Sequence, residues 1–409
     1  MRLSAERGND GLYYLTIRQT AEKWNISVRS VQNMCKNGLI HGAYKWGNSW
    51  KIPDDAERPA DKRRGALHHQ IFIPRKTPFL NMTNLYHTAG MADECGKELS
   101  DNPEARLLFE AEVAYSRGEI DKVYSHANEI LNIHTDFFFT IAGGMLLSLC
   151  AIWRGDIDLW KRAKRHISEA PCKSEIDHEL IHLAHASADS AIRNMADFPD
   201  WFRRGCFGVI PADAFPAAKV FYIKYLMEMA FSLAVGNVEY DDVKGLALMK
   251  TLPYIIEPMV AQTKAEKVVI AELYLRLLCA ISYKYIGDIE SAVSHLDKAI
   301  EIALADKLLG TLAEHRRYLG SLLDDRLNMA DPYAFKCFKE LHRQISDGWH
   351  SLHNRVMEKT VAINLSDRER EISTLAAFGF SNVEISEKLH ISVNSVKSII
   401  SMAMNKTGQ

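Results

Sequence analysis

The sequence predicts a mostly α-helical protein, in which a long helical-repeat middle lies between a small winged helix-turn-helix and a C-terminal helix-turn-helix. Three observations predict this: a glycine–acid motif recurs along the middle, helix-capping signals occur in close succession near both ends, and aromatic and basic residues alternate after the first pair of helices. The chain has 409 residues, of which 47% are hydrophobic and 25% charged. This composition is typical of soluble globular proteins, and the length suits about two to four domains.

Charge is distributed unevenly along the chain. Residues 1–76 contain 14 Lys and Arg against 7 Asp and Glu, residues 360–409 contain 5 of each, and the middle carries the negative excess. The basic N-terminal end is therefore the candidate for binding a polyanion. The 7 cysteines include no C-x-x-C pair, which argues against a zinc finger and is typical of the reducing cytoplasm. No apolar segment stands near Met1, so no secretory signal is expected.

Two joints divide the chain. Four prolines between Pro53 and Pro78 and a basic run predict a linker at 57–79. The repeat pattern ends near residue 346, and a new capping signal begins at Ser366, which predicts a second linker at 347–364. The predicted domains are residues 12–56, 80–346 and 365–409.

A short motif punctuates the middle of the chain: glycine, an acidic or amide residue, a β-branched residue and an acid. Its glycines are Gly118, Gly155, Gly236 and Gly287, which lie 37, 81 and 51 residues apart. Glycine suits the left-handed cap that ends a helix. A small residue in the following helix lets that helix pack closely; these residues are Ala127, Ala163 and Ala292. The pattern resembles the tetratricopeptide repeat family, which implies stacked helical hairpins with a concave binding surface.

One apolar stretch within the repeats allows two interpretations. Phe137 to Trp153 is 17 residues without a formal charge, whereas a bilayer span takes about 20 apolar residues. Thr140, Gly143 and Gly144 interrupt its apolar character, and it runs directly into the Gly155 motif. A buried helix is therefore predicted, with no membrane association.

The last predicted domain carries signals for three short helices. Capping boxes at 366–369 and 381–384 open two of them, and Ser392 caps the third. This segment resembles the DNA-binding domain of the LuxR family of transcription regulators, which implies that the last helix enters the major groove. Val393, Val396, Ile400 and Ala403 are expected to face inward. The outward residues are the predicted DNA contacts: Asn394, Ser395, Lys397, Ser398 and Ser401.

Charge leaves a second role open for this tail. Its net charge is zero, and Lys397 is the lone lysine on the face assigned to DNA. Because each neutralised phosphate adds to affinity, one cation supplies little attraction. A structural or dimerising module is the alternative. The resemblance allows a homodimer, since related tails usually work in pairs.

The first predicted domain begins with two short helices. Thr16 and Gln19 form a capping box for the first helix, and Ser27 caps the second. The inward face of the second helix is predicted to hold Val28, Val31, Met34 and Cys35. Its outward face offers cations and amides, which contact phosphates and base edges. The predicted DNA contacts on it are Arg29, Ser30, Gln32, Asn33 and Lys36.

A β-hairpin is predicted after the second helix. With a three-residue loop at 47–49, the aromatic side chains share one face with Ile52, and Lys45 lies opposite Lys51 on the other. The two helices and the hairpin resemble the winged helix-turn-helix of the MerR/excisionase type. The resemblance implies major-groove contact by the second helix and contact by the wing beside it, with Lys45 and Lys51 as DNA-binding residues. A protein-docking module is the alternative, but the basic charge favours nucleic acid.

Other kinds of site find little support in the sequence. Gly96-Lys97-Glu98 lacks the first glycine and the Ser or Thr of a P-loop, which argues against ATP-driven switching. His178, His182 and His185 share a predicted helix face, but no matching ligand cluster accompanies them, so no metal or other cofactor is predicted. No catalytic triad or carboxylate pair stands out, so an enzyme is not predicted.

The sequence therefore predicts a cytoplasmic, sequence-specific transcription regulator that binds double-stranded DNA. Its repeats are expected to sense a small molecule or a protein partner and to shift the spacing of the two DNA-binding ends. The alternative function is a helical-repeat adaptor that docks other regulators without binding DNA through its tail.

Overall fold

The computed structural model describes residues 6–7, 13–24, 26–36, 40, 42–47, 49–56, 86–99, 103–133, 136–195, 197–211, 214–234, 242–358 and 365–407. The chain separates into two compact units, Met1–Gln70 and Ile71–Gln409. The smaller unit is named the head. The larger unit consists of the repeat body, residues 86–358, and the tail, residues 365–407.

The head combines two short helices with a small antiparallel sheet of strand order β1-β2-β4-β3. Its elements are β1 (Glu6–Arg7), β2 (Tyr13–Leu15), α1 (Ile17–Trp24), α2 (Val28–Lys36), β3 (Tyr44–Trp46) and β4 (Ser49–Pro53). The predicted capping box is confirmed, because Gln19 N–H donates to Thr16 Oγ1 at 3.3 Å and Thr16 N–H donates to Gln19 Oε1 at 2.8 Å. The core lies between helices and sheet; its buried side chains are Ala21, Val31, Cys35, Ile40 and Ile52.

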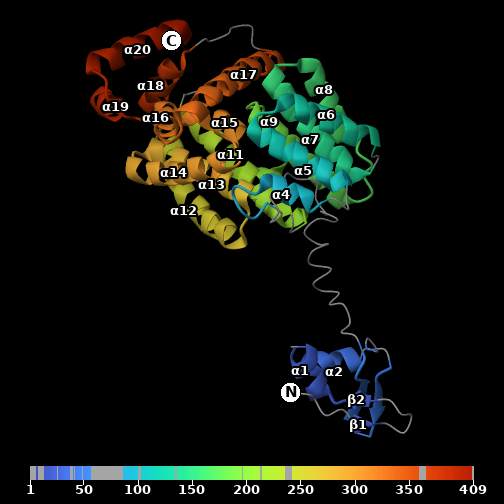
Figure 1. Ribbon diagram of the computed structural model, residues 1–409. Helices are drawn as coiled ribbons and strands as arrows, with labels where there is room; N and C mark the ends of the chain where they lie inside the picture. The colour runs from blue at the N-terminus through green and yellow to red at the C-terminus, as the bar shows by residue number, and fades with distance from the viewer. Residues whose placement is uncertain are drawn as a thin grey trace. The chain divides into compact units, whose positions relative to one another are not determined.

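The larger unit is helical throughout its described residues (Figure 1). Its first half contains α4 (Ala92–Lys97), α5 (Pro103–Arg117), α6 (Ile120–Ile133), α7 (Phe137–Arg154), α8 (Ile157–Ser168), α9 (Glu175–Ala191), α10 (Asp200–Arg203) and η1 (Phe207–Val209). Its second half contains α11 (Phe215–Ala234), α12 (Asp242–Glu266), α13 (Val269–Ile286), α14 (Ile289–Ala305), α15 (Leu309–Leu319), α16 (Ser321–Ala330), α17 (Pro332–Val356), α18 (Asp367–Ala377), α19 (Asn382–Leu389) and α20 (Val393–Thr407). Most neighbours in sequence pack as hairpins, for example α5 with α6 and α13 with α14.

The repeated glycines end helices as the sequence predicts. Gly118, Gly155 and Gly287 have φ values of 86°, 64° and 91°, in the left-handed region that glycine adopts without strain. Gly236 lies outside the described residues. The three small residues of the following helices are completely buried; they are Ala127, Ala163 and Ala292. The prediction of a mostly α fold with a helical-repeat middle is therefore confirmed.

Among the described helices, α7 has the length and mean hydropathy (1.6) of a membrane span. Of that stretch, 67% is buried inside the repeat body, where α7 packs against α6, α8 and α17. Its two glycines allow close packing, because a Cβ on Gly143 would lie 2.7 Å from Leu131 Cγ and one on Gly144 would lie 2.7 Å from Ile167 Cγ1. Helix α7 is a core helix of the body, as predicted.

The hairpin array packs back onto its own beginning, since α15 contacts α5 and α17 contacts α7. Both contacts use a glycine. A Cβ on Gly310 would lie 2.6 Å from Gly118 N, and one on Gly348 would lie 2.1 Å from the carbonyl oxygen of Trp153. Because backbone meets backbone at these points, no larger residue fits without moving a helix.

The boundary expected near residue 346 is absent. Helix α17 continues without a break from Pro332 to Val356, so the predicted linker at 347–364 is helical over its first ten positions, 347–356. The reason is burial: Gly348 packs against α7 and Leu352 is fully buried. Residues 359–364 lie outside the described residues.

Candidate nucleic-acid interface

The tail is a three-helix domain in which α19 and α20 form the helix-turn-helix. Both predicted capping boxes are present, at Ser366 with Glu369 and at Ser381 with Glu384. His390 ends α19 in the left-handed conformation with φ of 50°, and the Ser395 N–H donates to Ser392 Oγ at 3.0 Å to cap α20. The turn and its caps therefore fix the direction of α20.

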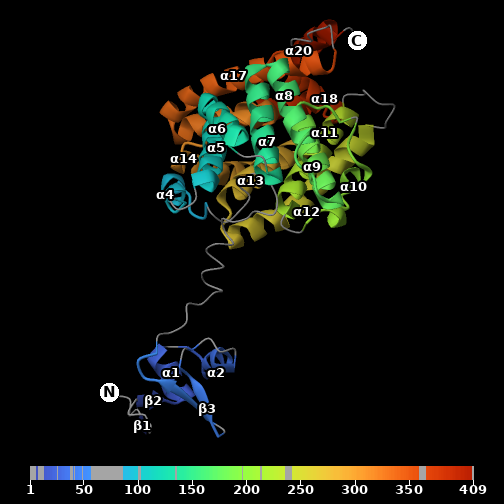
Figure 2. The same cartoon turned by 90° about the vertical axis from the view of Figure 1, so that its right-hand side faces the viewer.

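The outward face of α20 carries the residues that the sequence assigns to DNA. Its exposed residues are Asn394, Ser395, Lys397, Ser398 and Ser401. Val396 and Ala403 are buried, and Val393 and Ile400 are half-buried. Figures 1 and 2 both show α20 at the outer edge of the larger unit, with its main contacts to α18 and α19. The side chains assigned to DNA thus remain accessible.

This geometry agrees with a family-level comparison. Residues 363–408 match the model of the bacterial regulatory proteins of the luxR family. The match covers the tail and indicates a DNA-binding transcription regulator. No curated protein matches the chain, and no solved structure matches it.

The luxR-family tail is docked on the repeat body by a buried ion pair. Lys284 Nζ of α13 lies 2.7 Å from Glu371 Oε1 of α18, and the two side chains are 6% and 7% exposed. The same Nζ donates to the carbonyl oxygens of Tyr318 and Leu319 at 3.0 Å, and Arg368 Nη1 donates to Glu371 Oε2 at 2.9 Å. Burial lowers the pKa of Lys284, while Glu371 acts in the opposite direction. Lys284 and Glu371 therefore each have ion-pair and hydrogen-bond partners inside the interface between body and tail.

An aromatic contact lies beside the ion pair. The ring of Phe378, at the end of α18, lies 5.6 Å from Phe231 and 5.4 Å from Tyr285, centroid to centroid. Nothing in the tail's own sequence pattern indicates these partners, because they come from α11 and α13. The tail is thus part of the larger unit, with α18 toward the body.

In the head, most of the face predicted on α2 is exposed. Arg29, Gln32, Asn33 and Lys36 are all accessible, and they lie on one side of the helix by their spacing. Ser30 is half-buried, and its hydroxyl lies 2.8 Å from Ser27 Oγ, so it belongs to the helix cap. The accessible face of α2 therefore carries two cations and two amide side chains.

The inward face of α2 differs from the prediction at one position. Val31 and Cys35 are buried and Met34 is half-buried, as expected, but Val28 is 49% exposed. Val28 is the first helical residue, directly after the Ser27 cap, and it does not join the core cluster of the head. It is therefore not a core residue.

The predicted register of the wing is wrong. The strands pair Tyr44 with Lys51, Lys45 with Trp50 and Trp46 with Ser49, so two positions separate the strands in place of the predicted three. Lys45 and Lys51 consequently lie on opposite faces of the hairpin, because side chains alternate along a strand.

Two features account for the observed register. Gly47 has φ of 59°, the conformation that tight two-residue hairpin turns need. Strand β4 also pairs with β2, which places Ile52 opposite Leu15 in the core and so turns Lys51 outward. The outward face of the wing therefore combines Lys51 with Tyr44 and the 65% exposed Trp46.

The three histidines considered as metal ligands lie on α9 of the larger unit. His178 and His182 are exposed, His182 contacts Glu179, and His185 Nε2 lies 3.0 Å from Ser168 Oγ. They form no group with metal-ligand spacing within the part of the chain that the structure describes.

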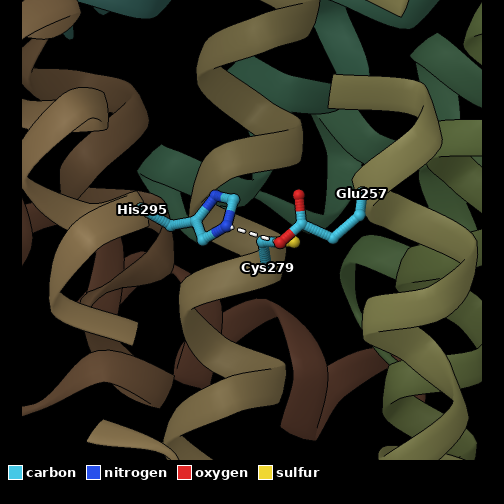
Figure 3. A group of neighbouring side chains, drawn as sticks. All are labelled: Glu257, Cys279 and His295. Atoms are coloured by element: carbon cyan, nitrogen blue, oxygen red, sulfur yellow. Dashed lines mark hydrogen bonds and ion pairs between the residues drawn. The ribbon is translucent and has the colours of Figure 1, made fainter. Parts of the chain in front are cut away.

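Sequence reasoning missed a different group, in the core between α12, α13 and α14. Figure 3 shows Glu257, Cys279 and His295, whose donor atoms lie within 4.8 Å of one another. His295 Nε2 lies 2.8 Å from Glu257 Oε1, which also accepts from the Tyr283 hydroxyl at 3.1 Å. Burial raises the pKa of the Cys279 thiol, so the thiolate that binds metals is disfavoured. Three donors also fall one short of a structural zinc site. Hydrogen bonding accounts for this arrangement.

Proposed function

We propose that the protein is a sequence-specific transcription regulator that binds double-stranded DNA through both its head and its tail. The observation that carries this proposal is the match of residues 363–408 to the luxR family, together with an accessible face on α20. The head supports it independently, because α2 presents cations and amides of the kinds that contact phosphates and bases.

The two ends contribute differently in this proposal. The head supplies phosphate attraction through Arg29 and Lys36, and its wing adds Lys51 and two accessible aromatic rings. The tail supplies base selection through Asn394 and the serines of α20, with Lys397 as its cation. The repeat body senses an effector, and the protein acts in the cytoplasm as a non-enzymatic regulator, apart from membranes.

DNA binding by the full-length protein tests the proposal. A binding site is first selected from a pool of random duplexes, and affinity is then measured by fluorescence anisotropy over a salt series. Arg29→Ala with Lys36→Ala should make the negative slope of log K against log salt shallower by about 1.8, since each phosphate contact contributes about −0.9. Asn394→Ala with Lys397→Ala should reduce discrimination between the selected and a scrambled site by about tenfold or more.

A matched control removes two cations from elsewhere on the surface. Lys97 and Lys298 are 71% and 61% exposed in the repeat body, away from both assigned faces. Lys97→Ala with Lys298→Ala should leave the salt slope unchanged. If the head variant binds DNA as wild type does, the face assigned on α2 is wrong. If the wild-type protein binds no duplex in dilute buffer, the adaptor function replaces the proposal.

A further inference from the structure

A pocket lies inside the repeat body at the point where the body meets the tail. Its cavity volume is about 90 Å³, and the empty space reaches about 880 Å³ when the solvent at its open mouth is included. Its walls come from the odd-numbered helices α5 to α17, which face the inside of the array, and from α18 of the tail. Apolar side chains form most of the wall; they include Leu149, Ile152, Met227, Leu278 and Ile345.

Each carboxylate in the wall already has its own cation. Lys224 Nζ lies 2.7 Å from Glu314 Oε1, and the Tyr274 hydroxyl donates to Glu314 Oε2 at 3.1 Å. Burial, the largest single influence, would raise the pKa of Glu314, but Lys224, His315 and the hydrogen bond from Tyr274 together outweigh it, and the pKa falls to about 2. Likewise, Arg193 Nε lies 2.6 Å from Glu228 Oε2. Glu314 is therefore ionised, and each of the two acids is paired with a cation.

Arg317 is the cation without such a partner. Among the described residues, no carboxylate forms a hydrogen bond or an ion pair with its guanidinium, which lies 4.3 Å from the ring centroid of Trp349 and 4.9 Å from that of Tyr318. Burial lowers its pKa to about 10, and the neighbouring cation Arg193 acts in the same direction. The wall of the pocket thus holds a desolvated positive charge.

A second arginine brings the tail into the same pocket. Arg370 lies on α18, and its Nη2 lies 3.1 Å from His350 Nε2 and donates to the carbonyl of Leu365 at 3.3 Å. His350 Nδ1 lies 2.7 Å from the carbonyl oxygen of Ser346, so this ring is neutral and accepts from Arg370 through Nε2. Arg317 of the body and Arg370 of the tail both line the pocket, and Arg370 is a minor influence that lowers the pKa of Arg317.

We propose that this pocket binds a small organic monocarboxylate with an apolar body, whose carboxylate is held by Arg317 beside Arg370. A planar guanidinium matches a carboxylate through two parallel hydrogen bonds. A doubly charged phosphate fits less well, because it would present charged oxygens on every side to a wall that is mostly apolar. The apolar wall receives the remainder of the ligand.

The bound anion would lie between a cation of the body and a cation of the tail. It would relieve their repulsion and so strengthen the docking of α18 on the body. This is the effector class for the regulator proposed above, and the coupling to DNA rests on that proposed function. Binding of the ligand and its effect on α18 are independent of the proposed regulator function.

The first experiment measures binding to the full-length protein by isothermal titration calorimetry. The probes are benzoate and hexanoate, with benzamide and inorganic phosphate as matched comparisons. Both carboxylates should bind, whereas benzamide and phosphate should bind at least about tenfold more weakly, since a charge-assisted hydrogen bond contributes that much. Equal binding of benzamide, preference for phosphate, or no carboxylate binding at millimolar concentration overturns the proposal.

Variants locate the site. Arg317→Met should reduce carboxylate affinity about tenfold or more, and Arg317→Lys should retain part of it, because lysine keeps the charge but lacks the planar fork. Arg343→Met is the matched control, since Arg343 is 63% exposed on α17 and paired with Glu340. Thermal unfolding of each variant checks that it is folded. Unchanged affinity in a folded Arg317→Met variant places the ligand elsewhere and overturns the assignment.

The second experiment tests the link to the tail by hydrogen–deuterium exchange. Benzoate should slow amide exchange in α18 of the wild-type protein and have little effect on α18 in Arg370→Met. Absence of protection in the wild type overturns the coupling. If protection occurs but the protein binds no duplex DNA, the pocket assignment holds and the regulator proposal fails, so the two are distinguished.

Discussion

The head and the larger unit use charge in opposite ways. In the head, the described cations of α2 are on the surface, and the described buried side chains carry no formal charge. In the larger unit, several charged groups are buried and paired with groups from distant helices, as Lys284 is with Glu371. Surface charge is available to a partner, whereas buried charge holds helices in position. We therefore expect the exposed charges of the head to bind a partner, and the buried ion pairs of the larger unit to hold its helices together.

Removal of a buried charge should have the largest effect on stability. Lys284→Met leaves Glu371 buried without its main partner and should lower the free energy of unfolding of the larger unit by about 3 kcal/mol, measured by urea denaturation. The loss lies at the low end for a buried pair, because Arg368 still contacts Glu371.

Two comparisons make that result specific. Lys284→Met with Glu371→Leu should recover most of the loss, since both charges are then gone. Lys298→Met breaks an exposed pair with Glu301 and should change stability by less than about 0.5 kcal/mol. A similar small change for Lys284→Met would contradict the coupling role of buried charge.

Closure of the hairpin array gives the next largest effect. Gly348→Ala brings a Cβ to 2.1 Å from the Trp153 carbonyl oxygen, so α17 has to move away from α7. We expect a loss near the upper end of about 1–3 kcal/mol in urea denaturation, because the obstacle is backbone and not a flexible side chain. Gly208→Ala is the control, since its Cβ meets nothing within 4 Å. Equal stability of the two variants would show that the contact is not tight.

Acid should weaken the larger unit through a buried histidine. Burial lowers the pKa of His315 from 6.5 to about 4, so the folded state keeps the ring neutral. As pH falls below 6.5, the unfolded chain binds a proton that the folded chain does not, and stability decreases until the pH reaches about 4. The contribution of His315 should be about 2 kcal/mol lower at pH 5 than at neutral pH.

His315→Asn should flatten this part of the curve of unfolding free energy against pH. His178→Asn, at an exposed position on α9, should leave the curve as in the wild type. A His315→Asn curve with the wild-type slope would refute the assignment.

Local sequence signals predicted the helix ends and the exposed faces well. Capping boxes such as Ser381 with Glu384 depend on residues three positions apart, and the left-handed glycines depend on a single residue. The five residues assigned to DNA on α20 are accessible because a helix exposes one stripe at a fixed period.

Predictions that depend on distant partners were less successful. The register of the wing is set by Ile52 pairing with Leu15, almost forty positions away, and the hairpin sequence alone does not contain that information. Arg317 and Arg370 line one pocket only because the three-dimensional fold brings α15 and α18 to the same cavity. Their helices show no motif for a ligand site, and the pocket was therefore not predictable from spacing.

The contacts at Gly310 and Gly348 affect how the repeat body comes apart. A linear stack of repeats loses its outermost unit first, because that unit has a single neighbour. Here α5 contacts both its neighbour α6 and the distant α15, and α7 contacts both its neighbours and the distant α17. The first hairpins therefore have partners on both sides and cannot unfold one at a time from a free end. We expect the helices of the body to melt together, and an extra hairpin inserted by duplication would disrupt the body where a linear stack would simply lengthen.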